Sequence, residues 1–406
     1  MTRPTVSAPT LFAVFAFAYF LSALLRAVTA TLAPVFSAEL GLQAADLGLL
    51  AGAYFFGFAV MQLPLGRALD HFGPRRTLAV LIGVAVLGCA GFALATQLAA
   101  LIAARAVIGA GMAAALMAPL TAYRQHFSAA LQLRANSWML MTGSLGMVAS
   151  TLPVQLLLPL LGWRGLFWAA AVMLLVAVAA VLWLVPPDTP LRPEEADAPG
   201  NYREIVSHPL FVRTAPMGFV VYGGLIAVQS LWAGPWLTRV SGWSASQAAQ
   251  GLFGINLAML VSFGAWGMLM PRLVDRGIDA WRLITWGVPL SLLTLAWIVL
   301  AGGRAGAAAW SLWCVCCTFV SLSQPAVAAA FPAAQAGRAL SAFNLVIFAG
   351  IFCIQWGLGL LIDLLRAQGF ADEAAFRGAF GTFGLCCVSS YVWFLVYGRR
   401  AADNAS

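Results

Sequence analysis

The chain has 406 residues, of which 62% are hydrophobic and only 9% are charged, and its formal net charge is +8. A soluble globular domain carries about 25% charged residues. This composition excludes an ordinary soluble enzyme or nucleic-acid-binding domain. We attribute the excess of basic residues to contact with anionic lipid headgroups.

Apolar stretches follow one another almost without a break from residue 11 to residue 397. Each has roughly the 18–25 residues that a helix needs to cross a bilayer. We therefore predict an all-α membrane protein with twelve transmembrane helices, at 11–34, 46–66, 77–95, 99–121, 135–160, 165–186, 211–238, 247–270, 283–302, 307–331, 339–362 and 376–397.

The longest polar stretch in the middle of the chain, residues 187–210, is rich in Pro and charged residues. It is too short to form a folded domain. We expect it to be a cytoplasmic linker between an N-terminal six-helix bundle, residues 1–186, and a C-terminal six-helix bundle, residues 211–406.

The arginines predict the orientation, because cytoplasmic loops are enriched in basic residues. All 22 basic residues are Arg, and two of them, Arg26 and Arg105, lie in the interior of spans. Five lie in loops of one side, which leaves fifteen on the side of both termini; the five are Arg164, Arg239, Arg304, Arg366 and Arg377. We expect a multi-pass inner-membrane protein with both termini in the cytoplasm.

The loop after the second span reads LGRALDHFGPRR, residues 65–76. Glycines suit a tight turn or a close approach of helices, and an Asp can cap a helix or pair with an Arg. A basic cytoplasmic loop would explain the arginines but not the regular spacing of Gly66, Asp70, Gly73, Arg75 and Arg76.

Two further stretches extend this pattern. The fourth span contains RAVIGAG, with Arg105, Gly109 and Gly111, and residues 270–282 hold a degraded copy of the first loop in which Asp275 corresponds to Asp70. Together with twelve spans and a central linker, these motifs resemble the major facilitator superfamily over essentially the whole chain. The Gly-Pro of that family's antiporter signature is absent from the fifth span.

The resemblance implies a fold of two pseudo-symmetric six-helix bundles, with substrate bound near the membrane midplane between them. It implies alternating access by rocking of the bundles, with helices 1, 4, 7 and 10 lining the cavity. It also implies that the loop motif and its degraded copy form a cytoplasmic conformational latch.

The first span carries a charged side chain, Arg26, on a polar stripe with Tyr19, Ser22 and Thr29. The steps of three and four residues place them on one helical face. A charge inside a span usually faces the bundle interior or water. Snorkelling toward an interface, or a purely structural role, remains the alternative for Arg26.

The seventh span repeats part of this face, since Tyr222 and Gln229 align with Tyr19 and Arg26 and are followed by Trp232 and Trp236. Arg105 is expected at the same depth as Arg26, either as a second substrate contact or as a packing element. No Asp or Glu lies inside a span, so we expect the substrate to bring the negative charge.

Four neutral side chains in the C-terminal half are candidate substrate contacts, although each can instead form a hydrogen bond between helices. They are Asn256, Gln324, Asn344 and Gln355. Asn344 and Gln355 are expected to share one face of their helix.

All seven cysteines fall inside predicted spans, and an odd number there argues against a disulfide framework. The sequence CVCC invites a soft-metal site, but packing is the preferred interpretation. We expect no metal site and no cofactor.

The hypothesis from sequence is a secondary transporter for a small organic anion. It is expected to be a monomer in the lipid bilayer without nucleic-acid partners. The alternatives are an exporter of amphipathic compounds, a soft-metal or metal-chelate importer, and a non-transporting membrane sensor. An enzyme is disfavoured because no span holds a His, Asp or Glu for acid–base chemistry.

The orientation can be tested with reporter fusions. Fusions after Ala95, Gly162 and Gly303 should report the periplasm, and fusions after Arg76, Asp197 and Arg276 the cytoplasm, because the arginine bias fixes the loops. Periplasmic labelling after Asp197 would overturn both the orientation and the assignment of the linker.

Overall fold

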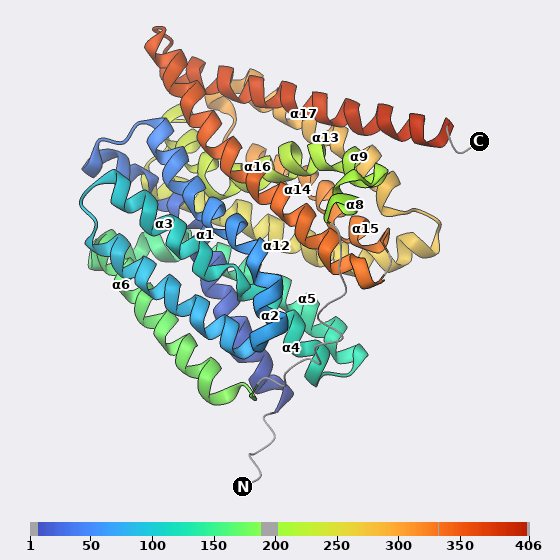
Figure 1. The fold of residues 1–406 in the computed structure, drawn as a ribbon. Coiled ribbons are helices and arrows are strands. Elements are labelled where there is room, and N and C mark those ends of the chain that lie inside the picture. The colour runs from blue at the N-terminus through green and yellow to red at the C-terminus, as the bar shows by residue number, and fades with distance from the viewer. Residues whose placement is uncertain (1–6, 188–201, 332, 404–406) are drawn as a thin grey trace. The chain divides into compact units, whose positions relative to one another are not determined.

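The computed structural model describes residues 7–187, 202–331 and 333–403, and these residues form helices without a single strand (Figure 1). Eleven helices in this part of the chain are long and apolar enough to cross a membrane. A shorter apolar helix, Trp138–Ala149, lies where the fifth span was predicted. The all-α class is confirmed, and the number of helices agrees with twelve spans.

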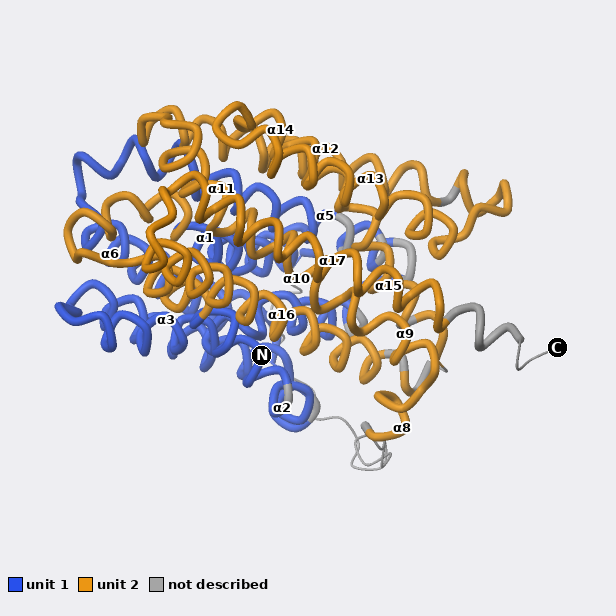
Figure 2. Tube along the Cα trace, turned by 90° about the horizontal axis from the view of Figure 1, so that it is seen from above, with its two compact units in different colours: residues 1–28, 53–199 blue, residues 29–52, 200–406 orange. Residues whose placement is uncertain are grey.

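The chain divides into two compact units, which Figure 2 shows in different colours. Unit 1 comprises residues 1–28 and 53–199, and unit 2 comprises residues 29–52 and 200–406. The predicted linker falls mostly on residues 188–201, which lie outside the described residues. The sequence-based domain limits therefore stay a prediction.

Unit 1 is built from the first helices of the chain, two of which, α1 and α2, also contribute residues 29–52 to unit 2. The helices are α1 (Ala8–Leu40), α2 (Ala44–Leu94), α3 (Leu98–Met112), α4 (Ala114–His126), α5 (Ala129–Ala149) and α6 (Leu152–Leu184).

Unit 2 holds the remaining elements, which begin with the short helix α8. They are α8 (Tyr202–Ser207), α9 (Pro209–Met217), η1 (Gly218–Tyr222), α10 (Gly223–Ala227), η2 (Val228–Trp232), α11 (Ala233–Pro235), η3 (Trp236–Val240), α12 (Ala245–Asp275), α13 (Ala280–Ala301), η4 (Gly302–Arg304), α14 (Ala307–Ser321), α15 (Ser323–Ala329), α16 (Ala333–Ala367) and α17 (Asp372–Asp403).

Two of the long helices each consist of two helical segments joined at a glycine, and in α2 these segments are two separate spans. Gly73 divides α2 with a φ of 79°, and Gly162 divides α6 with a φ of 63°. Only glycine adopts this backbone conformation without steric cost. The turn expected at Gly73 between the second and third spans is confirmed.

The fifth predicted span, 135–160, is not one continuous helix. Its first part ends at Ala149, and α6 restarts at Leu152. The hydroxyls of Ser150 and Thr151 donate to carbonyls of the last turn, Met147 at 2.7 Å and Val148 at 2.6 Å. Polar side chains that bond to nearby backbone compete with continuation of a helix, which hydropathy alone does not register.

The seventh span is irregular, because three π-helical segments interrupt it: η1, η2 and η3. All four candidate residues of this span lie in them: Tyr222 in η1, Gln229 and Trp232 in η2, and Trp236 in η3. Such segments are rare and occur frequently at functional sites.

The core of unit 2 is aromatic. Trp236 meets Trp310 and Phe380 edge to face, with ring centroids 5.3 and 5.2 Å apart. Trp310 in turn meets Trp313 at 5.6 Å. Edge-to-face geometry at these distances is the favoured arrangement of aromatic pairs. This cluster therefore packs η3, the last part of the seventh span (which we call helix 7), against α14 and α17.

In unit 1 the motif glycines let α2 and α3 approach closely. A Cβ on Gly109 would lie 1.9 Å from the carbonyl oxygen of Tyr54, and one on Gly111 would lie 2.4 Å from the backbone nitrogen of Ala85. Without a hydrophobic force between helices in lipid, small residues at contacts maximise packing. The RAVIGAG motif therefore serves helix packing.

Gly109→Ala should lower the melting temperature of the purified protein, because the added methyl forces α2 and α3 apart at a typical cost of about 1–3 kcal/mol. Gly83→Ala is the matched control, since no atom lies within 4 Å of the position its Cβ would take. Equal melting temperatures for the two variants would contradict the close approach.

Candidate functional site

Arg26 lies near the middle of α1, and its side chain is only partly buried. Its Nε is enclosed and has no hydrogen-bond partner among the described residues. Every described Asp and Glu lies at a helix end or in a connecting segment. Within the described chain, the Arg26 cation thus has no carboxylate inside a span to offset it.

Arg105 is completely buried in α3. Its Nη1 donates to the carbonyl oxygen of Leu25 at 2.8 Å, and its guanidinium lies 5.3 Å from the centre of the Tyr54 ring. The contact with Leu25, the neighbour of Arg26, brings the Arg105 guanidinium to the backbone beside Arg26. Arg105 is thus engaged by a carbonyl and an aromatic ring within unit 1, as a packing element would be.

Tyr54 of α2 connects this group, and sequence reasoning missed it. Its hydroxyl lies 3.2 Å from the hydroxyl of Ser22 and donates to the Ser22 carbonyl, also at 3.2 Å. Its ring lies beside the Arg105 guanidinium, and its backbone carbonyl packs closely against Gly109. The only signal in the sequence was a polar aromatic residue between Gly52 and Gly57 in an otherwise apolar span.

Tyr19 lies one turn before Ser22 on the same face of α1. Its ring packs on Gly143 of α5, where a Cβ would lie 2.5 Å from a ring carbon. Ser22 is almost fully buried and is engaged by Tyr54. Tyr19 and Ser22 of the predicted stripe thus have contacts within unit 1, and Arg26 is the charged member of the stripe.

The two tryptophans expected to line a cavity are both completely buried. Trp236 belongs to the aromatic core, and its Nε1 donates to the Ala305 carbonyl at 3.0 Å. Trp232 donates to the Gln355 carbonyl at 3.1 Å. Trp236 therefore packs in the core and does not line an open cavity, because an amphipathic indole satisfies its N–H and its ring together in a core.

Gln229, the counterpart of Arg26, also points to a neighbour within unit 2. Its Nε2 donates to Asn256 Oδ1 at 2.9 Å, and Asn256 Nδ2 donates to the Leu252 carbonyl at 2.9 Å. Both side chains are buried. This pair has the geometry of a hydrogen bond between helices, the alternative stated for Asn256.

The remaining neutral candidates form two networks. Tyr222 donates to Gln324 Oε1 at 3.5 Å, and Gln324 Nε2 donates to Asn344 Oδ1. Gln355 is completely buried and donates to Ser230 Oγ at 2.9 Å. Asn344 and Gln355 thus have different partners, and only the Tyr222–Gln324–Asn344 network is partly exposed.

The predicted latch is described in part. The Arg75 guanidinium donates to the Leu182 carbonyl, and Arg76 is exposed. Gly66 lies in regular helix with open space around it, so the structure gives it neither a turn nor a close contact. The side chain of Asp70 lies outside the described part of the chain.

In the degraded copy of the loop motif, residues 270–282, Asp275 does not have the role that its alignment with Asp70 suggests. Asp275 is exposed and makes no hydrogen bond or ion pair among the described residues. Asp279 instead caps α13, accepting from the Arg282 backbone N–H at 2.8 Å. Gly277 forms the turn with a φ of 74°, and the Arg282 guanidinium donates to its carbonyl at 2.8 Å.

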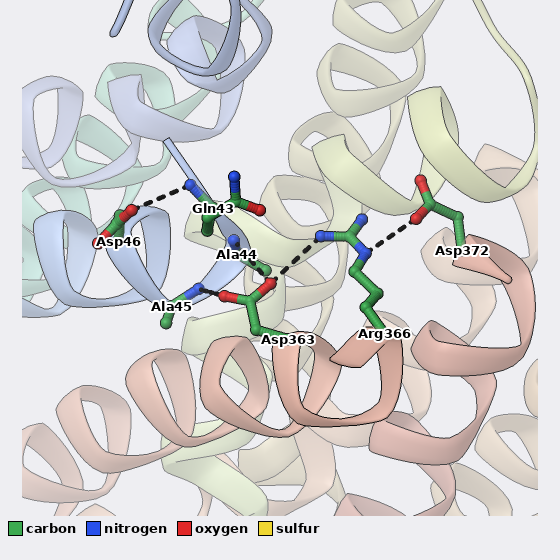
Figure 3. A network of polar contacts seen from close by, with 7 residues as sticks. All are labelled: Gln43, Ala44, Ala45, Asp46, Asp363, Arg366 and Asp372. Carbon is green, nitrogen blue, oxygen red and sulfur yellow. Dashed lines mark hydrogen bonds and ion pairs between the residues drawn. The ribbon is translucent and has the colours of Figure 1, made fainter. Parts of the chain in front are cut away.

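A charged network in unit 2, absent from our predicted site residues, joins the start of α2 to α16 and α17 (Figure 3). Asp363 accepts from the backbone N–H groups of Ala44 at 3.2 Å and Ala45 at 2.6 Å. Arg366 links Asp363 at 3.3 Å to Asp372 at 2.8 Å. We call these residues the Asp363 network.

The network lies where backbones approach closely. A Cβ on Gly48 would lie 2.3 Å from the Gln355 carbonyl oxygen, and one on Gly359 would lie 2.3 Å from the Ala44 carbonyl oxygen. The first turns of α2 are therefore docked on α16 by small residues and by a carboxylate at the helix N-terminus, where negative charge is favoured.

The family model described as Major Facilitator Superfamily matches residues 15–354. The chain belongs to the major facilitator superfamily. It is accordingly a secondary transporter and not an enzyme, and it is a multi-pass membrane protein that acts on a small-molecule substrate.

Solved structures of major facilitator transporters are similar over nearly the whole chain. A bacterial homolog of the human lysosomal transporter Spinster, inward-facing and occupied, matches with a TM-score of 0.78 at 16% identity, covering 97% of this chain and 98% of that one. A D-xylose–proton symporter matches with a TM-score of 0.74 at 15% identity, covering 95% and 96%.

The nucleoside transporter NupG matches with a TM-score of 0.72 at 13% identity, covering 95% of this chain and 98% of that one. At these identities the likeness shows the fold, two pseudo-symmetric six-helix bundles, and leaves the substrate open.

Asp363→Asn should weaken the docking of α2 in this superfamily member. Both oxygens of Asp363 accept hydrogen bonds, and an amide replaces one of these oxygens with an NH₂ group that cannot accept. At least one hydrogen bond is therefore lost, which should lower the free energy of unfolding by about 1–2 kcal/mol. Thermal unfolding of the purified protein measures the change. Asp275→Asn, at an exposed carboxylate, is the control, and an equal shift in both variants would contradict the role of the network.

Proposed function

We propose that this transporter carries a small organic anion and that Arg26 is its main contact. The observation that carries the proposal is a cation in the middle of α1 with an enclosed, unpartnered Nε and no carboxylate inside a span among the described residues. A buried charge is costly without a partner, and an anionic substrate supplies that partner when it binds.

Arginine suits this role because its planar guanidinium takes a carboxylate or phosphate in a two-point contact. Arg105 is then a positioning residue, since its contact with the Leu25 carbonyl fixes the backbone next to Arg26. Tyr19 and Ser22 continue the same face of α1. Ser22 and Tyr54 already bond to each other, which leaves Arg26 as the charged group available to a ligand.

In unit 2 the polar group proposed for neutral contacts is Tyr222, Gln324 and Asn344, because it is partly exposed. Gln229 with Asn256, and Gln355 with Ser230, are assigned to contacts between helices. Trp232 and Trp236 are not proposed as walls of this site, since both are buried.

Transport of an anion constrains the energy source. An inside-negative potential opposes its entry by about 2.3 kcal/mol per charge per 100 mV. Import therefore requires a co-ion, an exchanged anion or a protonated substrate. Two described carboxylates at helix ends, Asp46 and Asp363, are the candidates for carrying a proton or binding a co-ion during import.

The proposal extends to orientation and to the latch. Both termini are placed in the cytoplasm of a bacterial-type inner membrane, following the arginine bias. Gly66, Asp70, Gly73, Arg75 and Arg76 form the cytoplasmic latch, in which the contact of Arg75 with the Leu182 carbonyl ties the loop to the end of α6.

Arg26→Gln should nearly abolish anion binding, because truncating one partner of a buried charge pair costs about 2–5 kcal/mol. Arg26→Lys keeps the charge but loses the two-point contact, and it should be intermediate. The measurement is thermal stabilisation of the purified protein by a panel of organic anions, followed by uptake into proteoliposomes. Arg304→Gln, at an exposed arginine of unit 2, is the matched control.

The outcomes separate the roles of Arg26. If Arg26→Gln folds and keeps wild-type anion affinity and uptake, Arg26 only snorkels and the anion proposal fails. If Arg26→Gln melts early but Arg26→Lys restores both stability and affinity fully, the role is structural, since a substrate contact requires the guanidinium fork.

A further inference from the structure

Unit 2 contains two adjoining cavities with volumes of about 290 Å³ and 370 Å³. They share four lining residues, Ser37, Leu42, Arg239 and Arg366, so they form one hollow. The hollow lies between the end of α1, the start of α2, the last part of helix 7, and the facing ends of α16 and α17. We call it the Arg239 cavity.

The charges that line the Arg239 cavity favour an anion. They are Arg239, Arg366 and Asp372, one more cation than carboxylate. Asp372 begins α17, where the helix N-terminus offsets part of its negative charge. Asp363 and Asp46 lie close by but do not line the cavity, and both accept hydrogen bonds from backbone N–H groups at the start of α2.

Arg239 is the lining cation that is free to bind a ligand. Its side chain is exposed, and it makes no ion pair or hydrogen bond with any other described residue. Arg366 has Nε on Asp372 and Nη1 on Asp363, and its Nη2 makes no hydrogen bond with any other described residue. Two guanidinium groups thus face one hollow, and together they can hold the two oxygens of a carboxylate or phosphate.

Much of the remaining lining is apolar. It includes Pro34, Leu47, Trp232, Pro235 and Phe376. Trp232 and Phe376 meet edge to face with centroids 6.1 Å apart. The Arg366 guanidinium lies 5.7 Å from the centre of the Phe376 ring, so cation and aromatic carbon adjoin in this hollow. Such a lining suits an anion that carries a small apolar body, for example an aromatic carboxylate.

We propose that the Arg239 cavity is a second anion-binding site, which holds a carboxylate or phosphate between Arg239 and Arg366 and its apolar part against Trp232 and Phe376. Ala33, the lining residue nearest to Arg26 along α1, is seven residues after it, about 10 Å along the helix. The site is therefore separate from Arg26 and does not depend on the role proposed for it.

The position gives the site a consequence for transport. Arg366 holds Asp363, which docks the start of α2. An anion on Arg366 competes with Asp363 and Asp372 for the same guanidinium, so its binding acts directly on the contacts that join α2 to α16. By the arginine bias this is the outer side, where a substrate would arrive first during import.

The test uses the whole purified protein and needs no knowledge of the substrate. Phenylglyoxal modifies accessible arginines, and peptide mass spectrometry gives the rate at each one. Benzoate and inorganic phosphate serve as probes at constant ionic strength. At a probe concentration about ten times its dissociation constant, modification of Arg239 should slow about tenfold. Modification of Arg304, which is exposed but outside the cavity, should not change.

Equal protection of Arg239 and Arg304, or none at either, would overturn the site. Protection seen only after addition of phosphatidylglycerol, and not with either soluble probe in lipid-free detergent, would assign the cavity to a lipid headgroup and also overturn it. Greater protection by benzoate than by an equally charged formate would support the apolar wall.

The Arg26→Gln protein separates this inference from the proposed function. Protection of Arg239 that persists in Arg26→Gln supports an independent site, whether or not Arg26→Gln still transports. Protection that disappears in Arg26→Gln would mean that the effect originates at Arg26, and the inference of a second site would fail while the function proposed for Arg26 stands.

Discussion

A cation inside hydrocarbon must be compensated, and this constraint organises unit 1. Arg105 meets it within the chain, because the Leu25 carbonyl and the Tyr54 ring face its guanidinium. Arg26 does not, since its Nε is enclosed without a partner among the described residues. The two arginines thus differ in their surroundings, and this difference is the basis for proposing Arg26, not Arg105, as the contact for a ligand.

The packing around them follows from the same apolar solvent. Helices in lipid gain little from burying apolar area against each other, so close backbone contact and internal hydrogen bonds carry the stability. Gly109 on Tyr54 and Gly48 on Gln355 are such contacts. The buried amides of Gln229 and Gln355 pair with side chains of unit 2 for the same reason. In an alternating-access transporter, contacts of this kind must re-form in more than one arrangement.

Much of the architecture could be predicted from the sequence, because hydropathy and arginine position register what lipid requires of a span. The turn at Gly73, with its positive φ, followed from the spacing of the loop motif. The break at Ser150–Thr151 and the π segments of helix 7 did not, since both depend on local hydrogen bonds that hydropathy ignores. Trp236 was misplaced because an indole suits a core and a cavity wall equally well from sequence.

The network of Asp363, Arg366 and Asp372 shows the other limit of sequence reasoning. Its partners lie about 320 residues apart along the chain, and no local pattern links the start of α2 to the end of α16. Helical periodicity assigns faces, but it does not say which helices meet. The site in unit 1 was foreseeable as a polar stripe, whereas Tyr54 entered only through its contact with Ser22.

The central claim is that a negatively charged substrate pairs with Arg26 and compensates its positive charge. The most direct measurement changes the charge on the ligand and leaves the protein intact. An organic acid that is taken up by proteoliposomes is compared with its uncharged amide, of nearly equal size, as a competitor. We predict that the amide does not compete at concentrations where the acid saturates uptake, and competition equal to that of the acid would contradict the account.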